Sequence, residues 1–514
     1  MRQKQFNLFF GLDCCIIIIG GSEMATLQEK RTAWFYVHTA IGLFLMFVAG
    51  HILEPVYPLT DVGVQVLAVF VGVLWLWCFV GFLWPSLLAL VAFGLTDFAP
   101  FATTINSAFG AGVPILLLFS MILFGSPQHV GATKYITRWF LTRKIFNNRP
   151  IVFSFVFIMA TYALSIAINV TPALILMWTV LYGVLKDLGY KPGDKYSTLM
   201  LIGTFLGAIS GQASLPFTGS TLAILSVYAT AVYEITGQQM PIPHLQYILL
   251  GMINSVIVFV IYCLLIKFVF KPDLTNVANV NTEMFEKNPL PPMSKLQRAN
   301  FYGMLAFVVM MLLPSFLPSG FVVTELLETI GATGAAILIT GVMVLLRVDN
   351  QPVLDFKDVA ANSINWDVYV MVVAALAISG ALTNPATGVV DMMIVVLEPV
   401  LGGHTPAVFF VIMLLFGIFV TSFGSALVIS IATMPVLVAF GYDSGANLPA
   451  VAATFTLLVH YSIILPSASV FAAMLWSNKE WVTGREVFRY GMAIVIVATL
   501  VSLFIMMPIS SIML

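Results

Sequence analysis

The sequence predicts an all-α polytopic membrane protein with about 11 transmembrane helices, two re-entrant hairpins and two broken helices arranged as inverted repeats. Composition, the length of the apolar stretches and the placement of charge support this prediction. Apolar residues make up 60% of the 514 residues, charged residues only 9%, and the mean hydropathy is +1.02. So little polar surface cannot solvate a soluble globule, and lipid is therefore the expected solvent.

Several apolar stretches reach the roughly 20 residues that a helix needs to cross about 30 Å of hydrocarbon. Examples are residues 33–53, 63–84, 247–270 and 490–512. The four cysteines form no CxxC pair, so the sequence indicates neither a metal site nor a disulfide framework, and no cofactor is expected. Residues 1–32 do not resemble a signal peptide, and we treat them as an N-terminal segment that is either untranslated, with Met24 as the start, or disordered.

The 22 Lys and Arg residues fall into a few blocks separated by long stretches without any. The blocks lie within residues 2–31, 134–149, 186–195, 267–298, 347–357 and 479–489. Loops rich in Lys and Arg stay on the cytoplasmic side of a membrane, and one membrane topology places every block on that side. This topology predicts a multi-pass protein of the cell (inner) membrane with a cytoplasmic N-terminus, a C-terminus outside, and a basic surface helix near residues 133–146.

The predicted first transmembrane half, residues 33–270, contains two interrupted apolar blocks. Residues 150–184 break at Asn169–Pro172, which favours either a re-entrant hairpin or a pair of kinked helices. Residues 199–233 are interrupted by the polar, Gly- and Pro-containing segment 210–221, which predicts a broken helix. Irregular backbone at membrane depth is tolerated where it is buried or lines a cavity, so these interruptions mark a candidate binding site.

The second half, residues 300–514, repeats this order after a predicted cytoplasmic linker over residues 271–299. A hairpin block over residues 407–440 precedes a broken helix over residues 451–476, at an offset of about 250 residues. In this topology, the first hairpin enters the membrane from the cationic side and the second enters it from the side without Lys or Arg. The two halves therefore look like inverted repeats.

From residue 33 to 514 the chain resembles the divalent anion:sodium symporter family, which comprises sodium-coupled dicarboxylate, citrate and sulfate carriers and their exchanger relatives. Family members carry Ser-Asn-Thr at each hairpin tip and a Thr-Pro-Pro-Asn-like motif in each broken helix. The first tip here keeps Asn169, whereas the second keeps Ser425 but has Ala426 in place of the Asn. Thr218 and Ser469 match the hydroxyl positions of the broken helices, while Pro-Pro-Asn is absent from both.

The resemblance implies a secondary active transporter of small, divalent organic or inorganic anions such as dicarboxylates, working as a homodimer by an elevator-type mechanism. It implies an anionic substrate and lipid as partners, no nucleic acid, and a mechanism that is either cation-coupled, with sodium as the candidate coupling ion, or an exchange. The expected substrate-binding residues are Asn169, Thr171, Thr218, Ser220, Ser425 and Ser469, and the expected cation-binding residues are Asn169, Ser214 and Thr218. Ser and Thr in membrane helices also commonly bond the carbonyl one turn back, which is the alternative for each hydroxyl named here.

His460 is the one residue of the Asp, Glu, His, Lys and Arg set within residues 451–476. It can exchange a proton near neutral pH, and we expect it to contribute proton coupling if one sodium site has been lost with the second Asn. A neutral histidine that packs between helices is the alternative. A membrane enzyme is disfavoured because the interrupted segments hold no Asp, Glu, Lys or Arg, and a channel because inverted repeats favour alternating access.

Overall fold

The structure is a computed structural model that describes residues 33–132, 134–141, 148–217, 219–279, 291–317, 321–401 and 404–514. It confirms the predicted all-α polytopic fold, since the described chain is almost entirely helical and its only strands form one two-residue pair. Ten of the described helices are long and apolar enough to cross a membrane, and three more apolar helices are shorter.

The described first half contains twelve α-helices, two of them followed directly by a short π-helical turn. They are α2 (Ala33–Phe44), α3 (Gly50–Ile52), α4 (Asp61–Phe79), α5 (Leu83–Gly94), α6 (Phe101–Gly110), α7 (Gly112–His129), α8 (Lys134–Leu141), α9 (Pro150–Ile168), α10 (Val170–Asp187), α11 (Lys195–Ala213), α12 (Gly219–Thr236) and α13 (His244–Leu264), with π turns at Leu45–Ala49 and Leu265–Phe270.

The described second half follows a 3₁₀ turn at Val277–Asn279. It consists of α15 (Lys295–Leu312), α16 (Val322–Leu345), β1 (Arg347–Val348), β2 (Gln351–Pro352), α17 (Phe356–Ser363), α18 (Trp366–Thr383), α19 (Val389–Leu401), α20 (Pro406–Phe423), α21 (Ala426–Asp443), α22 (Leu448–Val459), α23 (Val470–Ser477), α24 (Gly484–Val501) and α25 (Met507–Met513), with further short turns at Leu313–Ser315, Pro385–Thr387, Pro466–Ala468 and Ser502–Met506.

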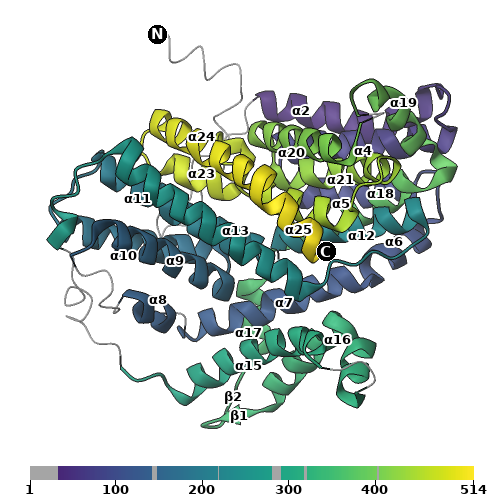
Figure 1. The fold of residues 1–514 in the computed structure, drawn as a ribbon. Helices are drawn as coiled ribbons and strands as arrows, with labels where there is room; N and C mark the ends of the chain where they lie inside the picture. Colours follow the sequence, from purple (N-terminus) through teal and green to yellow (C-terminus); the bar gives the residue numbers. More distant parts are fainter. Residues whose placement is uncertain are drawn as a thin grey trace.

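Each predicted hairpin block forms two helices that pack against each other, α9 with α10 and α20 with α21. Asn169 alone separates α9 from α10, and Gly424 and Ser425 separate α20 from α21. In Figure 1 the first pair lies in the left half of the molecule and the second pair in the right half. Each pair is followed by an interrupted helix, α11 with α12 in the first half and α22 with α23 in the second.

Close packing of α9 on α11 brings the first hairpin to the first break. Gly207 and Gly211 lie one turn apart on α11, and a Cβ on them would fall 2.5 Å from the carbonyl oxygen of Ile158 and 2.6 Å from that of Tyr162. Only glycine permits this approach, as in other small-residue helix contacts within membranes. Ser165 then donates a hydrogen bond to the carbonyl oxygen of Ala208 at 2.6 Å, which fixes the register of the two helices.

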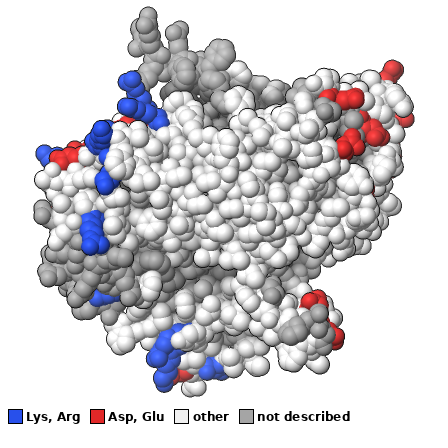
Figure 2. Space-filling model, viewed as in Figure 1, with Lys and Arg blue, Asp and Glu red and all other residues white. Residues whose placement is uncertain are grey.

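Charge separates toward the two ends of the molecule. On the face drawn in Figure 2, Lys and Arg gather at the end where α10 ends and α24 begins, and most Asp and Glu lie at the opposite end. This distribution agrees with the blocks read from the sequence, because it places the cationic loops at one end of the long helices.

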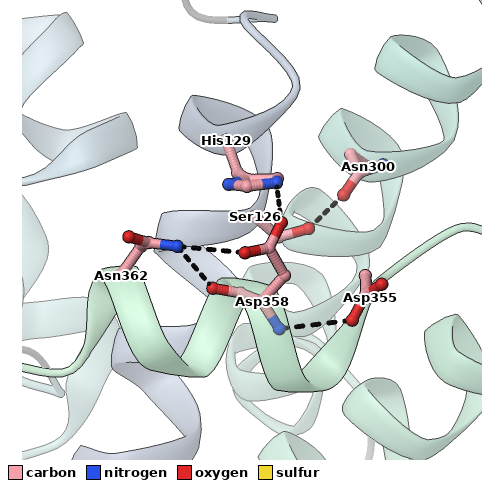
Figure 3. Close-up of polar contacts among 6 residues, drawn as sticks. All are labelled: Ser126, His129, Asn300, Asp355, Asp358 and Asn362. Carbon is pink, nitrogen blue, oxygen red and sulfur yellow. Dashed lines mark hydrogen bonds and ion pairs between the residues drawn. The ribbon is translucent and has the colours of Figure 1, made fainter.

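A polar cluster joins α7, α15 and α17 (Figure 3). The Nε2 atom of His129 lies 3.0 Å from a carboxylate oxygen of Asp358, and Ser126 bonds the side-chain oxygen of Asn300. Asn300 donates in turn to the carbonyl oxygen of Val353 at 2.7 Å. These contacts link three helices that contribute to neither hairpin nor break, and so give that part of the molecule its own polar framework.

Candidate functional site

The first hairpin turns at Asn169, the predicted tip residue. Its φ angle is 89°, a positive value that residues other than glycine rarely adopt. The side-chain oxygen of Asn169 accepts a 2.6 Å hydrogen bond from the backbone N–H of Val170 and so caps α10. The Asn169 side chain is exposed and Thr171 is half-buried in the first turn of α10, so the positive end of that helix lies at an accessible tip.

The first break separates α11 from α12 over residues 214–218, of which Thr218 lies outside the described residues. Ser214 is buried, donates to the carbonyl oxygen of Ser210 at 2.8 Å and accepts from the hydroxyl of Tyr162 at 3.1 Å. Ser214 thus ties the first break to an arm of the first hairpin. Ser220 stands in the first turn of α12, half-buried.

The two breaks meet at His460, which directly follows α22. Its Nε2 atom lies 3.0 Å from the hydroxyl oxygen of Ser220 and 3.3 Å from that of Thr221. Its Nδ1 atom lies 2.7 Å from the carbonyl oxygen of Thr456, which can only accept, so Nδ1 carries the hydrogen. In the neutral ring Nε2 is therefore an acceptor, directed at two hydroxyls of the opposite half.

Ser425 and Ser469 occupy helix N-termini in the second half. Ser425 is buried and precedes α21, without a side-chain bond to that helix's N–H groups. The thiol of Cys78 on α4 contacts the backbone of Ser425. Ser469 accepts a 3.0 Å hydrogen bond from the N–H of Ala472 and so caps α23. The side chain of Ser469 therefore has a structural role, whether or not it also binds substrate.

Only some of the predicted residues are brought into direct contact. Ser220 and His460 are joined, whereas no hydrogen bond among the described residues links Asn169, Ser425 or Ser469 to each other or to that pair. The second hairpin reaches the second break through Thr421, whose hydroxyl lies 2.8 Å from that of Ser462.

Sequence reasoning missed a buried network behind the breaks. The hydroxyl of Tyr461 lies 3.2 Å from that of Ser210 and accepts from the amide nitrogen of Asn254 at 2.9 Å, and these side chains are 0 to 1% exposed. Ser255 lies 3.5 Å from the hydroxyl oxygen of Ser214. Ser210 and Ser214 lie in the segment 210–221 that the sequence marks as a break, but nothing in the sequence singles out Tyr461, Asn254 or Ser255, because their partners lie on helices far apart along the chain. Thr221, next to the predicted Ser220, could have been found from the break itself.

The segments around the hairpin tips and breaks contain no Asp, Glu, Lys or Arg. These segments are residues 160–176, 206–224, 417–435 and 455–473. Four helices begin at these points, namely α10, α12, α21 and α23. Free N–H groups and partial positive charge at helix N-termini suit anions, and the hydroxyls supply further donors. This arrangement can bind an anion reversibly, and these segments contain no Asp, Glu, Lys or Arg that could act as an acid or a base.

Comparisons with known proteins agree with this architecture. The YdaH transporter of Alcanivorax borkumensis has a similar solved structure, with 12% identity, 79% of this chain and 87% of that chain covered, and a TM-score of 0.56. MtrF of Neisseria gonorrhoeae, described with a class of antimetabolite efflux pumps, gives 15% identity, coverage of 79% and 83%, and a TM-score of 0.52. At such identities the likeness concerns the fold alone. A search among curated proteins found no match.

A family model described as the sodium:sulfate symporter transmembrane region matches residues 31–513, almost the whole chain. The family consists of transporters, which excludes the enzyme alternative. The chain therefore belongs to the sodium:sulfate symporter family, as a multi-pass membrane protein and a secondary transporter of anions.

Proposed function

We propose that this protein carries small divalent anions, such as dicarboxylates or sulfate, across the cell membrane by elevator-type alternating access. The observation that carries the proposal is the contact of His460 with Ser220 and Thr221, which joins the interrupted helices of the two halves. The substrate would bind beside this contact, held by N–H groups at the starts of α10, α12, α21 and α23. Asn169, Thr171, Thr218, Ser220, Ser425 and Ser469 remain the proposed substrate-binding residues.

A site that is built from neutral hydrogen-bond donors favours reversible binding of the substrate, which transport requires, over tight binding. A lysine or arginine at such a depth would cost a few kcal/mol to bury and would hold a divalent anion tightly. Backbone N–H groups and hydroxyls replace only part of the hydration shell of the anion. Weak binding of this kind lets the anion leave on the far side.

The proposed coupling combines sodium with a proton. Asn169, Ser214 and Thr218 remain the proposed cation ligands at the first tip and break, while Ala426 stands where the second amide would be, which weakens a second sodium site. The hydroxyl of Thr221 donates to the carbonyl oxygen of Gln212, so Ser220 is the donor to neutral His460. When Nε2 is protonated, the oxygens of Ser220 and Thr221 can both accept its hydrogen. The contact therefore suits either protonation state, as a proton-coupling group requires.

The elevator mechanism assigns the hairpins and broken helices to a moving part and the framework of α7, α15 and α17 to a stationary part. Phe217 in the first break packs on Phe124 of α7 and Phe307 of α15, with ring centroids 6.3 and 5.6 Å apart. Apolar rings of this kind can slide without breaking hydrogen bonds. In this proposal both hairpins are re-entrant, the Lys- and Arg-rich end is cytoplasmic, the C-terminus is outside, and the stationary parts of two subunits form a homodimer.

Uptake into proteoliposomes tests the function and its coupling together. Radiolabelled sulfate, succinate and citrate would be offered under a sodium gradient, a proton gradient, both, or neither. We expect at least one divalent anion to accumulate, with both gradients contributing. Steep, multi-ion sodium dependence that His460→Gln leaves unchanged would contradict proton coupling, and no uptake of any anion would contradict the proposed substrate class.

A further inference from the structure

The side-chain oxygen of Gln212, in the last turn of α11, is a buried acceptor without a donor. The Gln212 side chain is 9% exposed, and its Oε1 atom has no hydrogen-bond partner among the described residues. We propose that Oε1 of Gln212 is a ligand of the transported sodium ion at the first break. The proposal rests on the sodium coupling proposed above and adds a residue that the family motif does not contain.

Three neighbouring donors form hydrogen bonds with other acceptors. Ser214 donates its hydroxyl to the carbonyl oxygen of Ser210 at 2.8 Å. The hydroxyl of Thr221 and the N–H of Leu215 both bond the backbone carbonyl of Gln212, at 3.0 and 3.2 Å. None of these groups donates to Oε1, and a buried acceptor without a donor is costly unless a cation or water binds it.

The electrostatics of the α11 end favour the cation. The last carbonyls of α11 give that helix end a partial negative charge, and Gln212 lies within this turn. Its ligands would be neutral oxygens, because no carboxylate occurs in residues 206–224. Neutral oxygens do not offset two positive charges in a lipid-surrounded site, so a monovalent hard cation fits better than a divalent one.

The position of Gln212 connects this ion to the proposed site. A Cβ on Gly219 would lie 2.5 Å from the amide nitrogen of Gln212, so the amide lies across the start of α12, beside Ser220. Thr221 bridges the carbonyl of Gln212 and the imidazole of His460, with contacts of 3.0 and 3.3 Å. An ion on Gln212 would thus favour one arrangement of the first break, the one in which an anion meets the start of α12.

Thermal unfolding of the purified full-length protein in detergent tests the proposal without relying on transport. NaCl would be titrated against choline chloride at constant ionic strength, and the shift in Tm would give an apparent sodium affinity. We expect Gln212→Leu to weaken this affinity at least tenfold. Gln246→Leu is the matched control, since Oε1 of Gln246 is also buried without a partner, at the start of α13. It should leave the sodium response unchanged.

Each outcome decides a different point. Equal sodium affinity in wild type and Gln212→Leu would overturn the role of Gln212 while leaving sodium coupling intact. Absence of any sodium response in wild type would overturn sodium coupling and this ligand together. If Gln212→Leu does not fold, Gln212→Glu decides, because its added charge should tighten sodium binding; unchanged affinity in that variant would overturn the proposal.

Discussion

The imidazole Nε2 atom of His460 lies 3.0 Å from the hydroxyl oxygen of Ser220, although 240 residues separate the two in the chain. The contact joins the break that follows α22 to the start of α12, so one half of the chain completes the break of the other. It is also the point at which a change of protonation would reach both breaks.

His460→Gln should retain anion binding but lose the response to an imposed proton gradient. The glutamine amide can still bond Ser220, whereas it cannot exchange a proton near neutral pH. Uptake under separate sodium and proton gradients measures this. Ser220→Ala serves as the companion variant, and we expect it to weaken substrate affinity while keeping the proton response. An unaltered proton response in His460→Gln would return His460 to a packing role.

Asn169→Ala should abolish transport while leaving expression and folding largely intact. The loss of one helix cap costs about 1 kcal/mol, which a packed membrane domain tolerates. Asn447→Ala removes a comparable cap, since Asn447 accepts from the N–H of Ala450 at 3.2 Å at the start of α22. If both variants transport equally well, Asn169 acts only as a cap.

Ser469→Ala and Thr218→Val should each raise the apparent KM for the anion with little change in maximal rate. Each variant removes one hydrogen bond, worth about 0.5 to 3 kcal/mol depending on whether its partner is charged. Because Ser469 caps α23, the Tm of the Ser469→Ala variant is measured alongside uptake. A fall in Tm without a change in KM would assign Ser469 to the helix alone.

Cysteines placed at Asp391 and Asp443 should react in intact cells with a reagent that does not cross the membrane, and one at Lys295 should not. All three positions are exposed. Asp391 and Asp443 lie between the cationic blocks 347–357 and 479–489, whereas Lys295 lies within the block 267–298. Variants are made in a background without native cysteines. Labelling at Lys295 would reverse the proposed orientation.

Alkylation of Cys78 should inhibit transport, because the thiol contacts the backbone of Ser425 at the second hairpin tip. An added group on the thiol would force α4 and this tip apart. Cys78 is exposed and Cys263 is buried, so the first should react faster. Cys78→Ser in a background lacking Cys14 and Cys15 should resist inhibition. Substrate that alters the labelling rate would support motion of the second hairpin past α4, as the elevator mechanism requires.

Residue types along the chain are enough to predict the lipid solvent, the helical class and the positions of the interruptions. Apolar stretches of span length leave no alternative to helices in lipid, because every backbone N–H and C=O must be satisfied within its own segment. Gly, Pro and Asn interrupt the apolar stretches locally. Helices α9 and α10 therefore meet at Asn169, and α11 ends at Ala213, within the segments expected to break. The matching of residues 31–513 to the family model agrees with the resemblance drawn from the same motifs.

Which polar groups meet depends instead on how the helices pack in three dimensions. The sequence marked Ser220 and His460 separately, but their contact depends on the packing of helices from two halves, and sequence spacing carries no information about such a pair. The same holds for Tyr461, which finds Ser210 and Asn254 on two other helices, and for Gln212, whose unpaired oxygen emerges only when neighbouring donors are counted. Backbone breaks are local and can be predicted from residue type, whereas hydrogen-bond partners in a membrane interior are chosen by close packing between helices distant in the chain.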